Sequence, residues 1–376
     1  MKIDLDIKQK VYRRNTNGLG YLHLDIWILL GIALLIIASS AVVYSASNGS
    51  EVILKNHLIR VGIAFLLLIL FAQIPPNLLR VYAPWLFGLV LILLIAVLLF
   101  GDASKGAKRW LDIGFTRIQP SEFMKLVLPM AIAWLFAHNT LPPPKARIIA
   151  GIITVLFTAG LIAVQPDLGT SILIAMSGIF VIFFAGLSWK WILAAISIIA
   201  ASLPILWNFY MHAYQKNRVL TFLNPESDPL GKGYNIIQSK IAIGSGGIEG
   251  KGFMGSTQSH LDFLPESTTD FIFSVLAEEF GLIGIFLLLC VYLFLIARGL
   301  YIAAMAQDNF SRLLAASLTM TLFFYVFINI GMVSGLLPVV GLPLPLISFG
   351  GSSLVTIMIS FGILMSIHTH KGLLKV

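Results

Sequence analysis

Asp270 is the residue of this sequence whose position best suits acid–base chemistry. It ends a long polar stretch, 210–270, and opens the apolar segment FIFSVLAEEFG. Its alternative role is to cap the helix that this segment predicts, but Thr268 and Thr269 precede it and can cap that helix equally well. Three capping residues in a row leave a carboxylate free to face a cleft, where partial desolvation suits a general base.

Glu122 and Lys125 are the second candidate group. They lie three residues apart on one face of a predicted helix that Pro120 opens. Ionisable side chains inside a membrane span are costly and indicate a functional site by default. The alternative is an ion pair that only fixes the helix. Lys105 and Arg109, in the basic segment just before this helix, favour a role in binding an anion.

Three other carboxylates have less certain roles in the sequence. Asp167, in the very short loop QPDLG, is expected either to cap the following helix or to contact the substrate. Glu278 and Glu279 follow Asp270 about two turns into the next helix. Because both would be buried, pairing or an interior structural role is expected for them.

The segment GLPLPLISFGGSS, 341–353, combines prolines and glycines at a predicted membrane boundary. Such irregular backbone is tolerated at membrane depth only where protein covers it or where it lines a cavity. Ser348, Ser352 and the two glycines between them could offer backbone N–H groups to an anion at the start of the last helix. The alternative is simple loop packing.

Two other patterns resemble functional motifs without matching them. GSGGIEGKG, 244–252, lacks the glycine and hydroxyl residues that a phosphate-binding loop needs at Ser245 and Gly252, so it is expected to form turns with positive φ. His368 and His370 resemble a metal-binding pair, but without carboxylate or cysteine partners we interpret them as interfacial residues. No metal-binding cluster is therefore predicted.

The composition indicates a membrane protein that crosses the bilayer many times. Of 376 residues, 58% are hydrophobic and only 11% are charged, against about 25% charged in soluble domains. The net charge of +8 suits anionic lipid headgroups or a phosphorylated substrate; nucleic acid is not expected, because no soluble basic domain is present. The single cysteine, Cys290, excludes a disulfide framework.

Hydropathy predicts one all-α membrane domain, 1–376, with about ten transmembrane helices. A cytoplasmic N-terminal tail, 1–23, precedes the first, and a large extracytoplasmic loop, 211–270, separates the seventh from the eighth. Thirteen Lys and Arg residues lie on the side of the termini, against six in the short segments opposite, which predicts cytoplasmic termini. The spans are expected near 24–46, 57–74, 79–100, 120–138, 148–165, 168–187, 189–210, 271–297, 312–336 and 349–368.

This orientation places the candidate residues outside the cytoplasm. No nucleoside triphosphate is available there, so a transferred group must carry its own activated leaving group. The motifs KGAKRWLDIGFTRIQPSEFMKL, QPDLGTSI, NPESDPLGKGYNIIQSKIAIGSGG and NIGMVSGLLPVVGLPLPLISFGGSS resemble the SEDS family (shape, elongation, division and sporulation) over nearly the whole chain. QPDLGT, PESDPLGKGY and the short N-terminal tail favour the elongation branch over the division branch.

The resemblance implies a ten-helix fold and polymerisation of lipid II into β-1,4-linked glycan strands at the outer face of the bacterial cytoplasmic membrane. It implies that Asp270 is the essential aspartate, with Glu122, Lys125 and Asp167 also sensitive positions. Inversion at the sugar needs one base and no covalent intermediate. Lys105, Arg109 or Lys125, or a bound divalent cation (Mg or Mn), would stabilise the leaving pyrophosphate.

The resemblance also implies partners: a class B penicillin-binding protein, which is a monofunctional transpeptidase, and other membrane proteins of the elongation complex. A lipid-linked-precursor flippase would explain the polar cavity and buried carboxylates equally well. It predicts symmetric halves, however, and the long polar stretch has no counterpart in the first half. A non-catalytic scaffold is a third interpretation, and it makes no demand for Asp270.

Overall fold

The structure, a computed structural model, describes residues 22–104, 107–112, 117–137, 140–165, 167–187, 233–261 and 263–370, with short pieces between 190 and 224. Eight helices of the described residues are long and apolar enough to cross a membrane, and α7 is a shorter apolar helix. Nine of the ten predicted spans coincide with these helices, whereas 189–210 lies largely outside the described residues. The helices are α2 Ile26–Ala46, α3 Glu51–Gln73, α4 Pro76–Phe100, α5 Pro120–Ala137, α6 Lys145–Val164, α7 Leu168–Phe184, α12 Ile272–Ala304, α13 Asn309–Val333 and α14 Ser352–Thr369.

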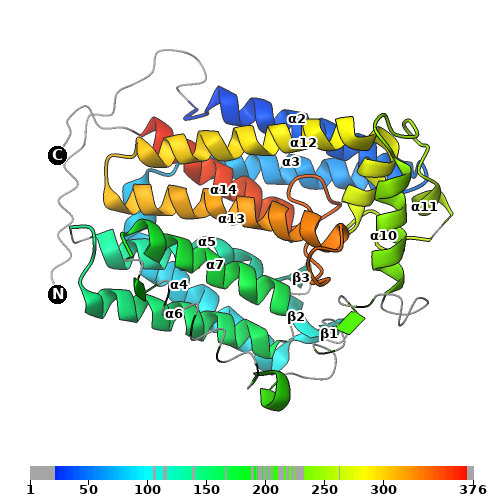
Figure 1. The fold of residues 1–376 in the computed structure, drawn as a ribbon. Coiled ribbons are helices and arrows are strands. Elements are labelled where there is room, and N and C mark those ends of the chain that lie inside the picture. Colours follow the sequence, from blue (N-terminus) through cyan, green and yellow to red (C-terminus); the bar gives the residue numbers. More distant parts are fainter. Residues whose placement is uncertain are drawn as a thin grey trace.

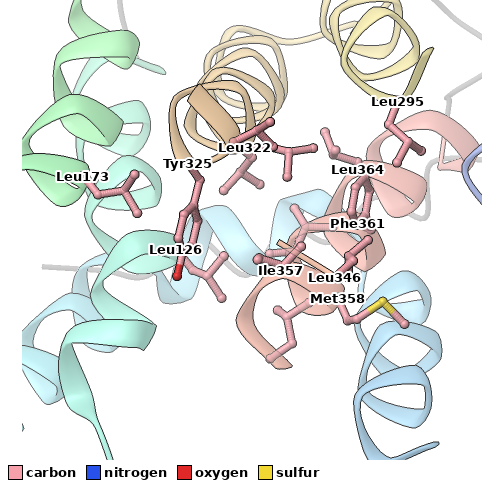
Figure 2. Packing of buried hydrophobic residues seen from close by; sticks show 14 of the residues in the cluster. Leu126, Leu173, Leu295, Leu322, Tyr325, Leu346, Ile357, Met358, Phe361 and Leu364 are labelled. Atoms are coloured by element: carbon pink, nitrogen blue, oxygen red, sulfur yellow. The ribbon is translucent and has the colours of Figure 1, made fainter. Parts of the chain in front are cut away.

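The helices form two groups that meet along α13 (Figure 1). One group contains α2, α3, α12, α13 and α14, with α14 packed against α3 and α12 against both α2 and α13. The other contains α4 to α7, and both α5 and α7 pack against α13. Aliphatic side chains fill the interior between the groups, with Leu126 of α5, Leu173 of α7 and Leu322 of α13 among them (Figure 2).

Side-chain caps explain where several helices begin. Asp25 accepts hydrogen bonds from the first-turn N–H groups of α2, and Asp308 does the same for α13. The second span begins at Glu51, earlier than the predicted residue 57, because Ser50 accepts a hydrogen bond from the N–H of Ile53. A hydropathy window excludes the polar residues at the start of this helix, although a capping side chain places them inside it.

A small antiparallel sheet adds to the predicted all-α architecture. Strands β1 Asp102–Ser104, β2 Ala107–Asp112 and β3 Arg117–Ile118 are arranged in the order β1-β2-β3. The sheet lies at the same end of the bundle as α10 and α11 (Figure 1). Since β3 leads directly into α5, the sheet positions the predicted basic segment next to the start of the helix that carries Glu122 and Lys125.

The described part of the long polar stretch is ordered around α10 Tyr234–Ser245 and α11 Thr257–His260. The glycine-rich sequence between them docks its backbone onto α12 where that helix is interrupted at Gly281, whose φ is 59° and ψ is −158°. Gly247, Gly250 and Gly252 all have positive φ, which confirms turns in place of a phosphate-binding loop. Four backbone N–H groups make the contact: Lys251 to Glu278, Gly252 to Glu279, Leu282 to Gly247 and Ile283 to Ile248, at 2.9 to 3.2 Å.

Glu278 fastens the same loop through its side chain, which confirms the predicted structural role. The carboxylate is fully buried and accepts hydrogen bonds from Lys251 Nζ at 2.6 Å, Ser256 Oγ at 2.7 Å and the Thr257 N–H at 3.0 Å. Glu279, also fully buried, accepts a hydrogen bond from the Ser45 hydroxyl of α2. The two carboxylates therefore hold the outer loop, α12 and α2 together.

Gly281→Ala is expected to destabilise this docking. A Cβ on Gly281 would lie 2.4 Å from the N of Gly250 and 2.5 Å from the O of Ile248, and its φ and ψ are open to glycine alone among the ordinary residues. We expect a loss of about 2 kcal/mol or more of stability. Thermal unfolding in detergent measures it, with Gly88→Ala as the control, because a Cβ there meets nothing within 4 Å. Equal melting temperatures for both variants would contradict the docking role.

The two ends of the described chain meet at the opposite end of the bundle. Asp25 binds Arg298 at 2.7 Å and lies 3.5 Å from His368, so the expectation that His368 lacks a carboxylate partner is wrong. A carboxylate distant in sequence supplies the contact. The rings of His23 and His370 stack with centroids 3.7 Å apart. Both ends of the described chain therefore lie at the same end of the bundle, which agrees with the predicted even number of spans.

The stacked histidines are expected to separate at acidic pH. Burial and the adjacent His23 lower the pKa of His370 from 6.5 to about 4, and burial lowers the pKa of His23. Between these values the separated ends bind more protons than the stacked ends, so the contact is stable above pH 6.5 and is lost as the pH falls toward 4. An NMR titration of the His370 imidazole in nanodiscs should give a midpoint well below 6.5, raised by His23→Gln. A midpoint near 6.5 in the unaltered protein would exclude the buried stack.

Candidate active site

Asp270 lies just before α12 and beside the proline-rich segment 335–351. The side chain is half-buried, and a Cβ built on Gly341 would be 3.4 Å from its Oδ2 atom. Gly341 has a φ of 72°, a conformation that favours glycine. A residue with a side chain at this position would be strained by its backbone conformation, and its Cβ would only touch the carboxylate at van der Waals distance. Gly341 therefore lies beside the Asp270 carboxylate.

Glu122 and Lys125 form a buried ion pair near the start of α5. Their charged groups are 2.7 Å apart, and the residues are 5% and 4% exposed. Thr356 of α14 donates a hydrogen bond to the second Glu122 oxygen at 3.1 Å. A small cavity of about 30 Å³, large enough for water, adjoins Lys125. In this structure the pair links three helices from inside the core.

Tyr325 of α13 is a residue of this site that the sequence reasoning missed. Its hydroxyl lies 3.4 Å from Lys125 Nζ, and the ammonium is 4.6 Å from the ring centre. The ring points away from α13 toward Leu126 of α5 (Figure 2). The sequence did contain one signal for this residue, namely a tyrosine with its polar hydroxyl in the middle of a long apolar run.

Asp167 caps α7, which is one of the two roles expected for it, and the substrate contact stays a prediction. One oxygen caps α7 by accepting a hydrogen bond from the N–H of Thr170 at 3.3 Å. The other oxygen lies 3.4 Å from the Nε of Arg109 on β2. Asp167 is buried, whereas the Arg109 side chain is 30% exposed. The pair joins the sheet to α7. Lys105 falls outside the described residues.

The segment 335–351 packs against both the start of α7 and Asp270. A Cβ on Gly169, at the start of α7, would lie 2.9 Å from the carbonyl oxygen of Val340. The neighbouring Gly341 lies beside the Asp270 carboxylate. The first turn of α7, with Asp167 as its cap, and the start of α12 therefore pack against the same few residues. In the predicted irregular segment, residues 344–348 are buried, whereas Gly341 and Gly351 are exposed.

Ser348 does not offer its groups to an anion, contrary to the prediction. Its N–H donates to the carbonyl of Leu344 at 3.0 Å, and its hydroxyl donates to the carbonyl of Thr269 at 2.6 Å. The hydroxyl also accepts a hydrogen bond from the N–H of Leu344 at 2.7 Å. Ser348 is therefore a structural residue, which joins two parts of its own loop and binds that loop to Thr269. Ser352 is the first residue of α14, which has no side-chain cap, and its predicted role stays a prediction.

In the described arrangement the Asp270 carboxylate is half-buried, and two cationic side chains lie in the same region. Each cation, Lys125 and Arg109, lies against a carboxylate of its own. Within the described ranges no group of three or more His, Cys, Asp or Glu side chains is placed to hold a metal ion. The geometry suits proton transfer at Asp270 beside partly neutralised cations.

Comparison with known proteins places this geometry in a family. Residues 20–373 match the family of cell cycle proteins that comprises FtsW, RodA and SpoVE. The chain is 52% identical to the peptidoglycan glycosyltransferase MrdB of Escherichia coli K12 over 94% of its own length and 95% of that protein. It is 37% identical to MrdB of Helicobacter pylori J99, covering 92% of this chain and 90% of that one.

Solved structures agree with this match. A chain from a peptidoglycan synthase complex that coordinates polymerization and crosslinking superposes with a TM-score of 0.79 at 32% identity, covering 92% of this chain and 97% of that one. The rod shape determining protein RodA of Thermus thermophilus gives a TM-score of 0.69 at 28% identity, covering 92% and 96%. The chain therefore belongs to the FtsW/RodA/SpoVE family of cell cycle proteins, the SEDS family.

Proposed function

We propose that this protein is a peptidoglycan glycosyltransferase of the MrdB (RodA) type, which acts in rod-shape elongation. The observation that carries this function is the 52% identity to MrdB over nearly the full length of both chains. The placement of Asp270 at a half-exposed position, next to the buried carboxylates and cations, supports it. The substrate that fits this function is lipid II, whose sugar is already activated by undecaprenyl pyrophosphate.

In the proposed reaction the Asp270 carboxylate acts as general base. It removes the proton from the sugar 4-hydroxyl of the acceptor while that oxygen attacks the anomeric carbon of the donor. The bond from that carbon to the pyrophosphate breaks, and the configuration inverts from α to β. One base suffices, because the leaving group needs no protonation and no covalent intermediate forms.

The leaving pyrophosphate is strongly anionic and needs stabilisation as its charge develops. Arg109 is the best supported cation for this purpose, since its side chain is 30% exposed at the edge of the site. Lys105 lies in the same basic segment. Lys125 would have to act from the buried pair with Glu122, so its contribution requires an opening of the core around it.

A divalent cation is compatible with the described residues only as a partner of the substrate. Mg²⁺ is commonly held by one or two carboxylates together with substrate phosphates. Since the described residues place no three metal-binding side chains together, Mg²⁺ or Mn²⁺ would take most of its ligands from the pyrophosphate, with a single carboxylate from the protein. When bound, the ion would neutralise charge on the leaving group.

The expected location is the bacterial cytoplasmic membrane, with both termini in the cytoplasm and the Asp270 end outside. A class B penicillin-binding protein is the proposed partner. Likeness to a chain of a peptidoglycan synthase complex supports it. In that arrangement the glycan strand made by this chain would pass to the transpeptidase for crosslinking, together with other membrane proteins of the elongation complex.

Purified protein with lipid II, assayed with and without the transpeptidase partner, tests this function. Glycan polymer should appear on a gel and should disappear after muramidase digestion. Lipid II translocation in liposomes is measured in parallel. Translocation without polymer, even when the partner is present, would overturn the proposal in favour of a flippase.

A further inference from the structure

Asn329 of α13 has a position that neither the family match nor the proposed chemistry explains. Its side chain is fully buried, and its amide nitrogen donates two hydrogen bonds. One reaches the backbone carbonyl of Asp270 at 3.0 Å, and the other reaches the backbone carbonyl of Leu342 at 2.6 Å. Because both acceptors are carbonyl oxygens, the amide can lie only with its nitrogen toward them. Asn329 thus ties Asp270 to the segment that lies against its carboxylate.

The two residues before Asp270 are held in the same way. The carbonyl of Thr268 accepts a hydrogen bond from the N–H of Phe349 at 2.9 Å, and the carbonyl of Thr269 accepts one from the Ser348 hydroxyl at 2.6 Å. Three successive carbonyls, 268 to 270, are therefore each fixed by a donor from another part of the chain. We call this set of three hydrogen bonds the 268–270 clamp.

The clamp also sets Asp270 relative to the other charged groups. Asn329 follows Tyr325 by four residues, so both side chains lie on one face of α13. Tyr325 contacts Lys125, which is paired with Glu122. One rigid helical turn therefore spans the distance between the Asp270 backbone and the buried ion pair.

The Asn329 amide is only partly satisfied by hydrogen bonds. Among the described residues the Asn329 Oδ1 atom is buried and has no hydrogen-bond partner. A buried acceptor without a donor destabilises the fold. A short side chain with two diverging N–H donors satisfies both carbonyls, which an aspartate, serine or aliphatic residue cannot do. The benefit therefore lies in holding these two backbone segments.

We infer that Asn329 is a positioning residue for glycosyltransfer: through the 268–270 clamp it holds the Asp270 carboxylate at the place from which it deprotonates the acceptor hydroxyl. This inference rests on the proposed function of Asp270 as general base. A misplacement of about 1 Å at a reacting group costs about 10²-fold in rate. The loss falls on the chemical step, because the substrate-contacting groups themselves are unchanged.

Asn329→Leu tests the inference, since it is similar in size and removes both donors. We expect kcat for lipid II polymerisation to fall by about 10²-fold, with KM changed less than about twofold. Ser317→Ala is the matched control, because Ser317 is an equally buried residue of α13 whose hydroxyl donates to the carbonyl of Ser177, away from Asp270. The control should keep the wild-type kcat.

Ser348→Ala provides a second test that leaves Asn329 in place. It removes the bond to Thr269 alone from the clamp and should give a smaller fall in kcat, again without a matching rise in KM. If Asn329→Leu does not fold, this variant decides the question. Wild-type kcat in Ser348→Ala, or in folded Asn329→Leu, overturns the inference, as does a kcat loss shared by Ser317→Ala.

Asp270→Asn, assayed beside these variants, separates the inference from the function on which it rests. If Asp270→Asn polymerises lipid II at the wild-type rate, the general-base assignment fails. If Asp270→Asn is inactive while folded Asn329→Leu is fully active, the positioning role of Asn329 alone fails. Loss of kcat in both supports both.

Discussion

Asp270→Asn should lower the rate of lipid II polymerisation by about 10² to 10⁴-fold, the contribution typical of a general base. The substitution keeps the size of the side chain and removes its ability to accept the proton of the sugar hydroxyl. The hydrogen bond from Asn329 goes to the backbone carbonyl of residue 270, so the clamp is retained. The measurement is the initial rate of polymer formation at saturating lipid II, with the melting temperature recorded for the same preparation.

The control for this experiment is another carboxylate-to-amide change in the same protein. Asp308→Asn replaces the cap of α13, and asparagine caps helices about as well as aspartate. We expect wild-type polymerisation from it. Asp270→Glu should recover little activity, because the added methylene displaces the carboxylate within a site whose backbone is fixed. Full activity of the Asn variant would leave Asp270 a structural residue and require another base.

The membrane helices could be predicted closely from the sequence because hydrophobic length is a local property. The last span was expected at 349–368 and is observed at Ser352–Thr369. Helix starts were less predictable where a capping side chain adds polar residues, as Ser50 does for α3. The sheet between α4 and α5 was missed because its strands are very short, the shortest being Arg117–Ile118.

The candidate site could be predicted in part, because its charged residues stand out in an apolar chain. The Glu122–Lys125 ion pair, which the structure shows, was the alternative interpretation of their spacing on one helix face, and their role toward the substrate stays a prediction. The contact of Asp167 with Arg109 joins a helix cap to a strand and could not be read from spacing. Asn329 was missed because its role depends on two backbone carbonyls that come together only in the fold.

Ser348 shows the opposite error, because anion binding was predicted for a residue whose polar groups are bound within the protein. A serine beside two glycines before a helix favours an anion site, and its local pattern gives no sign of the partners that it finds in the fold. The hydroxyl is taken by the carbonyl of Thr269, which is 79 residues earlier in the chain. Sequence patterns therefore indicate which residues can bind a ligand, whereas the tertiary contacts decide which of them are already engaged.

For the Glu122–Lys125 pair, measurements of stability can separate a catalytic role from a structural one. Lys125→Met should cost about 3 to 5 kcal/mol of stability, because it leaves a buried carboxylate without its counter-ion. Glu122→Gln should cost less, since the Lys125 ammonium retains the Tyr325 hydroxyl and ring. The melting temperature in detergent measures both, and equal values for the two single variants would contradict this ranking.

The double variant Glu122→Gln with Lys125→Met distinguishes the two roles. It removes both buried charges, and replacing a buried pair by neutral groups of similar volume is often neutral or stabilising. Stability should therefore return toward that of the unaltered protein. If Lys125 helps to stabilise the leaving pyrophosphate, polymerisation remains low in this stable protein. If polymerisation returns with stability, the pair is only a link between α5, α13 and α14, and the pyrophosphate must be bound by Arg109 and its neighbours on the outer sheet.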